Sequence, residues 1–392
     1  MNKNVTKIVI YILVALLLAE VAFIGMNSSL FMPEETTAPT TLPTTAPTTA
    51  PTTEPTTAPT TEPTTAPTTA PTTAPTTEPT SAPTTEPTTE PVVLEQHYTI
   101  TMVGDCTLGC NPNLHNAPGR ILTLIGDDYE YPFRNVADYF RNDDLTLANL
   151  EVVFANSGTP VEKEYTFIAP TKYTQILTSS SVEVVNVANN HTIDFGQKGY
   201  NSTIQSLDEA GVGYVEDNKT LLYTTESGLV VGLFSGWKLS EEKVKSGIAK
   251  LKKEGAEIII CAFHWGVEYT YQPSETQVRF AKLAIDSGAD IVWGHHPHVL
   301  QPIKEYKDGI ILYSLGNFSF GGNLNPKDKD SAIVQIDIVR DADGKVHLGE
   351  LTAIPVRISS VSSHNDFQPT PYEEGSAAYE RVMSKLNGTY KG

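Results

Sequence analysis

The sequence has few positive charges. Its 392 residues contain 27 lysines and arginines against 46 aspartates and glutamates, which gives a formal net charge of −19. Nucleic-acid binding depends on clustered lysine and arginine, so no nucleic-acid partner is expected. A polyanionic substrate stays open, because a bound metal ion can reverse the local field on an acidic protein.

Cysteine is also scarce, with three residues at Cys106, Cys110 and Cys261. An odd number excludes a disulfide framework that pairs every cysteine within the chain. We expect Cys261 to be a small buried apolar residue. For Cys106 and Cys110, two free thiols and one bridge both remain open, since a bridge requires the loop between them to fold back.

Long apolar runs are rare, and residues 8–26 form the one that is long enough to cross a bilayer as a helix. Lys3 and Lys7 precede it, so the positive-inside rule predicts a cytoplasmic tail at 1–7 and an extracellular remainder. A cleaved signal peptide is the alternative. We favour an uncleaved anchor, because no clean small-residue cleavage site follows. The predicted location is therefore the cell membrane, with a single pass.

Residues 27–96 contain little that could build a folded core. Proline recurs every four residues from Pro39 to Pro91, mostly followed by two threonines. This spacing blocks helices and sheets and favours extended polyproline-like chain. The segment has almost no large apolar residues, so it predicts a disordered, semi-rigid Pro/Thr linker. Its threonines are candidate sites for O-linked sugar.

After the linker, short apolar runs alternate with amphipathic segments, which is typical of an α/β fold. We expect the main domain at 97–360 and a C-terminal extension at 361–392. The predicted strands are 98–103, 145–148, 182–187, 257–263, 290–293 and 310–314, with a hairpin of 332–339 and 346–354. The predicted helices are 243–254, 274–287 and 377–386.

Polar residues that can bind metal recur just past the ends of these predicted strands. Ligand sites in open α/β sheets lie at the carboxyl ends of strands, so six segments are expected to meet at one edge of the sheet. The most specific motif is 294–298 (GHHPH), which holds three of the nine histidines. The candidates in four of the other segments are Asp105, Glu151, Asn190, His191 with Asp194 beside it, and His264, and the sixth segment is 315–318 (LGNF).

These side chains supply carboxylate, amide and imidazole ligands. Such a set suits one or two divalent ions of the Mn, Fe or Zn type. Asp194 follows His191 by three residues and could orient its imidazole. No cysteine is needed as a ligand, although Cys106 lies next to Asp105.

Six motifs in this order resemble the CapA (PgsA) family, which is linked to synthesis and export of a poly-γ-glutamate capsule. They are residues 103–105 (VGD), 148–151 (ANLE), 188–191 (ANNH), 263–266 (FHWG), 294–298 (GHHPH) and 313–318 (YSLGNF). The family is similar to calcineurin-like metallophosphoesterases. The resemblance therefore implies a four-layer αββα sandwich with a metal centre.

By the same resemblance, the metal ligands would be Asp105, Glu151, Asn190, His191, His264, His296 and His298. Three departures from the phosphoesterase pattern bear on this set. Thr107 stands where the first motif has histidine, and Glu151 replaces an aspartate. The glycine of the last motif precedes His295, so His295 and His296 compete for one role.

Two functions follow from this resemblance. The first is a metal-dependent, hydrolase-like domain acting on an anionic surface polymer, with His191 as general acid and Asp194 orienting it. The second is a non-catalytic scaffold subunit of a membrane complex that makes or exports poly-γ-glutamate, which the threonine at position 107 favours. A zinc polysaccharide deacetylase ranks below both, because the chain lacks the required His-x-x-x-His spacing.

Overall fold

The computed structural model describes residues 94–391. The predicted cytoplasmic tail at 1–7, the anchor at 8–26 and nearly all of the linker at 27–96 lie outside the described residues. Among residues 94–391, no helix is both long and apolar enough to span a membrane.

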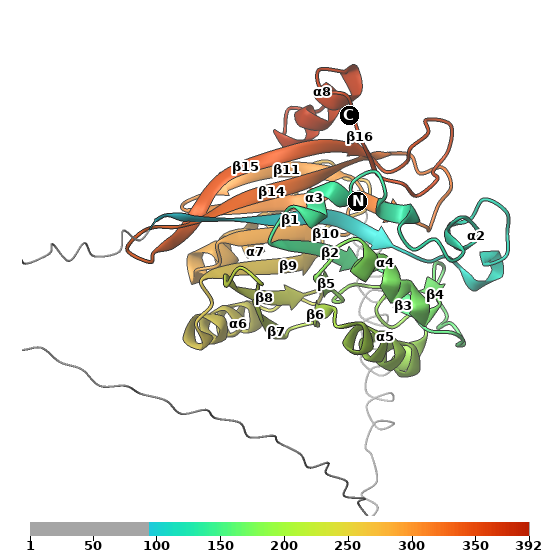
Figure 1. The fold of residues 1–392 in the computed structure, drawn as a ribbon, viewed down its shortest axis with the longest axis horizontal. Coiled ribbons are helices and arrows are strands. Elements are labelled where there is room, and N and C mark those ends of the chain that lie inside the picture. Colours follow the sequence, from blue (N-terminus) through green and yellow to red (C-terminus); the bar gives the residue numbers. More distant parts are fainter. Residues whose placement is uncertain (1–93, 392) are drawn as a thin grey trace, which may run out of the picture. The chain divides into compact units, whose positions relative to one another are not determined.

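The described chain builds two large sheets. The eight-stranded sheet has the order β16-β15-β14-β1-β2-β5-β6, with β13 also paired to β1. Strands β1, β2, β5 and β6 are parallel, whereas β14 is antiparallel to β1 and β15 is antiparallel to β14 (Figure 1). The bounds are β1 (Gln96–Thr107), β2 (Leu145–Leu150), β5 (Val184–Asn186), β6 (Gly213–Val215), β13 (Asn317–Phe320), β14 (Asp330–Arg340), β15 (Val346–Arg357) and β16 (Thr370–Pro371).

The six-stranded sheet has the order β11-β12-β10-β9-β8-β7. Its four central strands are parallel, and the two edge strands are antiparallel. The bounds are β7 (Thr220–Thr224), β8 (Val230–Gly236), β9 (Ile258–His264), β10 (Ile291–His295), β11 (Leu300–Tyr306) and β12 (Gly309–Leu315). A separate pair joins β3 (Val153–Phe154) to β4 (Ile168–Ala169).

Helices complete the fold. The long ones are α5 (Gly196–Ala210), α6 (Glu241–Glu254), α7 (Glu275–Ser287) and α8 (Ala377–Leu386). Shorter ones are α2 (Ile121–Ile125), α3 (Ala137–Arg141) and α4 (Thr174–Ser179). Helix α7 begins after Ser274, whose side chain forms a capping box with Gln277.

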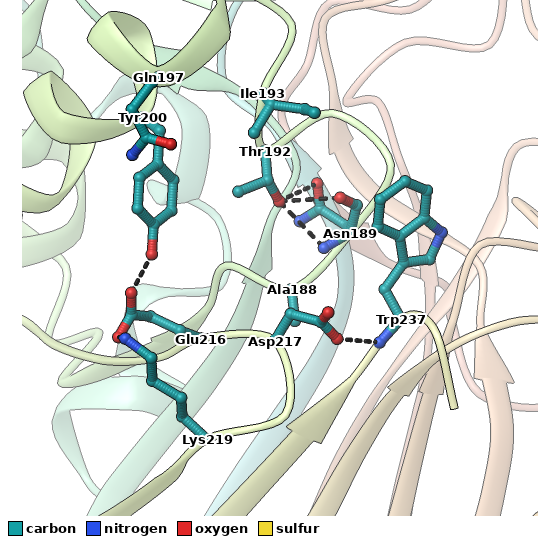
Figure 2. Close-up of a pocket in the computed structure, with 10 residues that line it drawn as sticks. All are labelled: Ala188, Asn189, Thr192, Ile193, Gln197, Tyr200, Glu216, Asp217, Lys219 and Trp237. Carbon is teal, nitrogen blue, oxygen red and sulfur yellow. Dashed lines mark hydrogen bonds and ion pairs between the residues drawn. The ribbon is translucent and has the colours of Figure 1, made fainter. Parts of the chain in front are cut away.

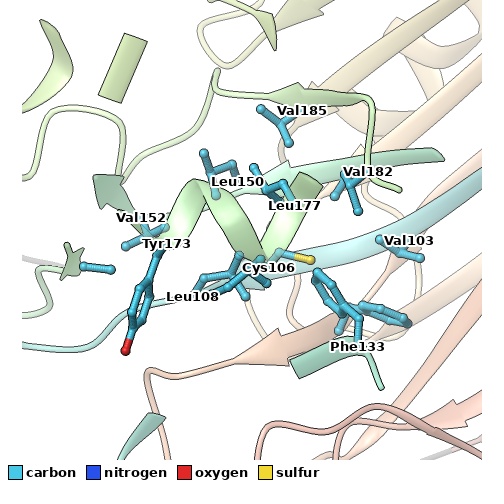
Figure 3. Close-up of a cluster of buried hydrophobic side chains, with 14 of the residues drawn as sticks. Val103, Cys106, Leu108, Phe133, Leu150, Val152, Tyr173, Leu177, Val182 and Val185 are labelled. Atoms are coloured by element: carbon cyan, nitrogen blue, oxygen red, sulfur yellow. The ribbon is translucent and has the colours of Figure 1, made fainter. Parts of the chain in front are cut away.

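Three apolar cores place these elements in layers. The central core joins β1 and β2 of one sheet to β9, β10 and β12 of the other, through residues such as Met102 and Trp293. Successive strand residues point to opposite faces, so Ile259 and Cys261 of β9 instead pack under α6 and α7. On the outer face of the eight-stranded sheet, Val185 of β5 and Leu177 of α4 belong to one buried apolar cluster (Figure 3). The order is therefore helices, sheet, sheet, helices.

The predicted α/β class is confirmed, and so is the hairpin, as β14 and β15. The predicted helix at 377–386 is α8, and it packs on β11 and β15. All three cysteines are free and buried, so the bridge between Cys106 and Cys110 is absent from the described chain. Burial raises the pKa of Cys110 to about 11, which leaves it an unreactive thiol at neutral pH.

Candidate metal centre

Asp105 is fully buried on β1. Its Oδ1 accepts a hydrogen bond from Asn149 Nδ2 at 2.9 Å and lies 3.1 Å from His295 Nδ1, while its Oδ2 lies 3.3 Å from His298 Nδ1. Burial by itself would raise the pKa of Asp105. Hydrogen bonds to His295 and His298 outweigh it and hold that pKa well below its usual range. Asp105 is therefore an ionised carboxylate at neutral pH.

Glu151 directly follows β2, and its carboxylate is fully buried. Neither of its oxygens has a hydrogen-bond partner among the described residues. Its Oε1 lies 3.7 Å from His264 Nε2 and 3.9 Å from His191 Nε2. Burial, followed by the charge of Asp105, raises the pKa of Glu151 to about 8. A buried carboxylate without a donor is costly, so this position fits a bound cation.

His264 ends β9 and faces the same space. Its Nε2 lies 2.7 Å from Asn190 Oδ1, and its buried Nδ1 has no partner among the described residues. Burial, with the charge of His296 next, lowers the pKa of His264 well below its usual value. A neutral imidazole is the form that binds metal, so His264 and Asn190 offer an imidazole and an amide oxygen.

The GHHPH segment leaves β10 at His295 and turns back sharply. His296 has a φ of 96° and His298 a φ of 54°, both in the left-handed region that such residues rarely adopt. Strained backbone of this kind clusters at functional sites. Here it turns His296 and His298 toward the carboxylates of Asp105, Glu151 and Glu268.

The two histidines of this turn differ in charge. Burial, with the charge of His298 next, lowers the pKa of His296 to about 4, so His296 is neutral. Burial also acts to lower the pKa of His298, but the carboxylates of Glu151 and Asp105 outweigh it and raise that pKa to about 9. Without a metal, His298 therefore carries the positive charge that balances Asp105.

His295 and His296 lie in different positions, so the structure distinguishes which of the two is the better candidate for a metal ligand. An imidazole nitrogen of His296 lies within 4.8 Å of ligand atoms of both Glu151 and His264. His295 instead contacts Asp105 through Nδ1, and it joins none of the ligand clusters of the described residues. The geometry favours His296 as ligand and His295 as the residue that holds Asp105.

Ligand atoms of the described residues gather in three clusters, and two of them share Glu151. Asp105, Glu151 and His298 form one, and Glu151, His264 and His296 form the other. Within each cluster the ligand atoms lie within 4.8 Å of one another. A carboxylate that belongs to both clusters could serve either of two ions, so Glu151 would be their common ligand. The Asp105 cluster has three ligands even though position 107 is threonine.

His191 borders the site from the loop after β5. Its Nδ1 lies 2.6 Å from Asp194 Oδ2, so Asp194 orients the ring as the spacing suggested and leaves Nε2 facing Glu151. Lys163 donates to Asp194 Oδ1 at 2.9 Å and to the carbonyl oxygen of Asn190 at 2.8 Å. Burial is the main cause that lowers the pKa of His191, which leaves it neutral.

The two asparagines of this loop, Asn189 and Asn190, make different contacts. Asn189 is buried, and its Nδ2 donates to the carbonyl oxygen of Leu150 at 2.9 Å, while its Oδ1 accepts from the His191 backbone at 3.0 Å. Asn189 thus braces the loop, and Asn190 presents its side chain to His264. Behind the loop, Asn189 lines a cavity of about 330 Å³ walled by Trp237 (Figure 2).

Two glycines let the chain pass close to the site. A Cβ on Gly104 would lie 2.1 Å from the carbonyl oxygen of Gly316, and one on Gly294 would lie 2.1 Å from that of Tyr313. No side chain fits at either position. Each glycine directly precedes a residue of the site, Asp105 or His295, so close backbone packing sets where those side chains begin.

Two expectations need correction. The candidate ligands do not lie at one sheet edge: Asp105, Glu151 and Asn190 come from the eight-stranded sheet, whereas the histidines of β9 and β10 come from the other. Asp105 also lies within β1 rather than after it, because residues 105–107 continue the strand by pairing with β13. The site thus forms where strand ends of two stacked sheets meet.

Two residues of the site were missed from the sequence. Glu268 forms a third ligand cluster with His296 and His298, and it is exposed. Glu268 lies in the loop that follows His264, and the sequence pattern around a loop glutamate does not indicate metal binding. Lys163 lies in a polar loop without a motif, so its contact with Asp194 depends on tertiary folding.

Two stacked sheets whose facing strand ends gather buried carboxylates and neutral imidazoles define an α/β protein with a candidate divalent-metal site. The sequence profile of the family described as bacterial capsule synthesis protein PGA_cap matches residues 99–322, and the chain belongs to this family. The CapA-type resemblance of the six motifs is thereby confirmed.

Relatives support the same assignment. The chain is 33% identical over 267 residues to the capsule biosynthesis protein CapA of Bacillus anthracis, covering 60% of this chain and 63% of that protein. It is 30% identical over 259 residues to the PGA biosynthesis protein CapA of Bacillus subtilis (strain 168), covering 58% of this chain and 68% of that one. The chain thus spans less than two thirds of the B. anthracis relative.

Among solved structures, the Haemophilus influenzae NAD nucleotidase is similar at a TM-score of 0.37 and 10% identity. The match covers 75% of this chain and 56% of that one. A likeness at this level carries no argument about function, so the function proposed below depends on the site itself and on the family.

Proposed function

We propose that this protein is a surface-anchored, CapA-type protein that acts on an anionic capsule polymer of the poly-γ-glutamate type through a metal-dependent, hydrolase-like site. The observation that carries the proposal is Glu151, a fully buried carboxylate whose two oxygens lack hydrogen-bond partners among the described residues. Neutral His264 and His296 face it. Such an arrangement is stable when a cation joins the carboxylate.

The proposed ligands are Asp105, Glu151, Asn190, His264, His296 and His298. His191, which the sequence also suggested as a ligand, belongs to none of the ligand clusters of the described residues, so we assign it to proton transfer. Carboxylate, amide and imidazole donors suit Mn, Fe or Zn, with one or two ions per site. A bound divalent ion would supply an activated water and polarise an anionic group of the substrate. We add Glu268 as a further candidate, because it lies at the exposed side of the same set.

His191 and Asp194 are the proposed acid–base pair. Asp194 fixes the tautomer of His191 by accepting a hydrogen bond from Nδ1–H, which leaves the unprotonated Nε2 directed into the site. The lowered pKa keeps His191 neutral at pH 7. An anionic substrate bound beside it raises that pKa again, so His191 takes up a proton and can pass it to a leaving group.

The competing function is a scaffold subunit of a polymer synthase or exporter. It would keep the fold, the membrane tether at 8–26 and the linker at 27–96, and it would need no turnover. Both functions place the folded domain outside the cell. Turnover therefore separates them.

The test uses the full-length chain purified with Mn and supplied with phosphomonoester, phosphodiester and γ-glutamyl substrates. The proposal predicts hydrolysis of at least one class and a loss of about 100-fold or more in kcat for His191→Ala. The matched control is His347→Ala, which removes an exposed histidine on β15. Bound metal without turnover, together with co-purification of a polymer synthase, would establish the scaffold function instead.

A further inference from the structure

A second pocket lies beside the metal centre and is basic, unlike the rest of this acidic chain. Its volume is about 640 Å³, and it lies between α8 and the loop that precedes β14. Seven charged residues line it: Lys327, Lys329, Arg357, Arg381, Lys385, Asp328 and Asp330. Five cations against two anions give the lining a net charge of +3, whereas the whole chain carries −19.

The two anions of this pocket are already neutralised. Lys385 is buried, and its Nζ lies 2.6 Å from Asp328 and 2.8 Å from Asp330. Arg381 makes a two-pronged contact with Asp330, at 2.7 Å to each carboxylate oxygen. These pairs form the floor of the pocket and offer little attraction to a ligand.

The other three cations remain available. Among the described residues, no carboxylate lies within salt-bridge distance of Lys327, Lys329 or Arg357. Arg357 donates to the backbone carbonyls of Ser359 and Ser360, which fixes its position but leaves its charge uncompensated. Unpaired cations at a concave surface attract an anionic ligand.

The loop after β9 runs from the metal centre to the pocket. Tyr271 lines the pocket and donates to Asp328 at 2.8 Å, and Lys327 lies 5.8 Å from the ring centre of Tyr269. Glu268, at the exposed side of the metal centre, precedes Tyr271 by three residues. Three residues of extended chain span at most about 11 Å, so the two sites are neighbours.

We propose that this basic pocket is a subsite for the carboxylates of an acidic polymer, holding the chain segment next to the one at the metal centre. The proposal rests on the proposed function, which supplies an anionic polymer as the substrate class. One extended strand of such a polymer can place one acidic group at the metal centre and the next ones against Lys327, Lys329 and Arg357. The pocket then sets which stretch of polymer enters the metal centre.

The experiment measures binding of a fluorescein-labelled γ-linked glutamate decamer to the full-length chain by fluorescence anisotropy. It is done after EDTA treatment, so that binding does not depend on metal. The variant is K327Q/K329Q, which leaves the Lys385 and Arg381 pairs intact. The matched control is K243Q/K253Q on α6, two exposed lysines without ion pairs among the described residues, which removes the same charge.

The pocket variant is expected to bind about tenfold more weakly than wild type, and the control about as wild type. Equal binding by the pocket variant and wild type would overturn the proposal. An equal loss in the control would also overturn it, since net charge alone would then explain the effect. Tighter binding of a polyphosphate of similar charge would contradict the assignment to carboxylates.

Failure of the proposed function has a different signature. Elemental analysis of the same untreated samples reports bound metal independently of the anisotropy result. A chain without bound metal that still loses decamer affinity in K327Q/K329Q would contradict the metal centre and support the pocket. A metal-loaded chain whose decamer affinity is the same in K327Q/K329Q as in wild type would support the metal centre and contradict the pocket.

Discussion

Glu151 shows most clearly how single residues define this site. A buried carboxylate normally accepts several hydrogen bonds, and Glu151 accepts none from the described residues. Asp105, only a few ångströms away, has Asn149 and two histidines as partners. The contrast means that Asp105 is satisfied by the protein alone, whereas a bound cation would satisfy Glu151.

This difference predicts opposite effects of Glu151→Gln on stability, depending on metal. In EDTA the variant is expected to gain about 1–3 kcal/mol in free energy of unfolding at neutral pH. The raised pKa of Glu151 makes the buried carboxyl destabilising above its unfolded pKa, and glutamine does not titrate. With Mn present it is expected to be less stable than wild type, because the ligand that stabilises the bound ion is gone. Urea denaturation under both conditions measures this.

Glu305→Gln is the control, since Glu305 is exposed on β11 and lacks an ion pair among the described residues. It should leave stability unchanged in both buffers. If Glu151→Gln lowered stability in EDTA as well, Glu151 would be contributing through protein contacts, and the metal interpretation would fail.

At the scale of elements, the positions of strands and helices could be predicted well from local patterns. Short apolar runs marked β1, β9 and β12, and the helix predicted at 274–287 matches α7 closely. Strand ends were less certain, because β1 continues to Thr107 through its pairing with the distant β13. Pairing between remote segments leaves no local trace in the sequence.

The site shows the same division. Motif spacing found Asp105, Glu151 and the histidines, because metal ligands at strand ends form recognisable patterns. Motif spacing could not tell whether His295 or His296 faces the other candidate ligands, because that depends on the left-handed backbone of His296. Lys163 and Glu268 were missed, because loop residues acquire their role through tertiary contacts.

Glu183, just before β5, is expected to make the stability of the fold depend on pH. Glu183 accepts a hydrogen bond from the Thr146 backbone at 2.8 Å, and burial, followed by the charge of Asp143, raises the pKa of Glu183 to about 7. A raised carboxyl pKa stabilises the fold below the unfolded pKa, and that stability is lost as pH rises toward 7. Ionisation of Glu183 therefore lowers the free energy of unfolding at high pH.

Glu183→Gln keeps the acceptor and removes the charge. We expect it to raise the free energy of unfolding by about 1 kcal/mol at pH 8 and to have no effect at pH 4, where wild-type Glu183 is already neutral. Urea denaturation across pH 4–8 measures the difference, with Glu305→Gln as the control. A gain of equal size at pH 4 would show that the effect is not one of ionisation.

At the scale of the whole molecule, the site depends on both sheets being held in register. Trp293 Nε1 on β10 donates to the carbonyl oxygen of Val103 on β1 at 3.0 Å. Ser235 on β8 donates to Asn186 Oδ1 on β5, and Asn186 in turn donates to Asn149, which holds Asp105. Buried bonds between sheets therefore lead directly to a candidate ligand.

The family and the site give complementary information about the molecule. Membership of the PGA_cap family connects the chain to capsule synthesis. The chemistry of the site connects it to a divalent ion. Neither alone makes the protein a catalyst, so the presence of a specifically bound ion is the claim on which the account depends.

The most direct test is the metal content of the full-length chain, measured by elemental analysis after incubation with Mn, Fe or Zn and removal of free ions. We expect one to two ions per wild-type chain, a loss of at least half of them in Glu151→Gln, and wild-type content in His347→Ala. A wild-type chain that retains no metal, or a Glu151→Gln variant that retains all of it, would show that Glu151 does not hold a divalent ion.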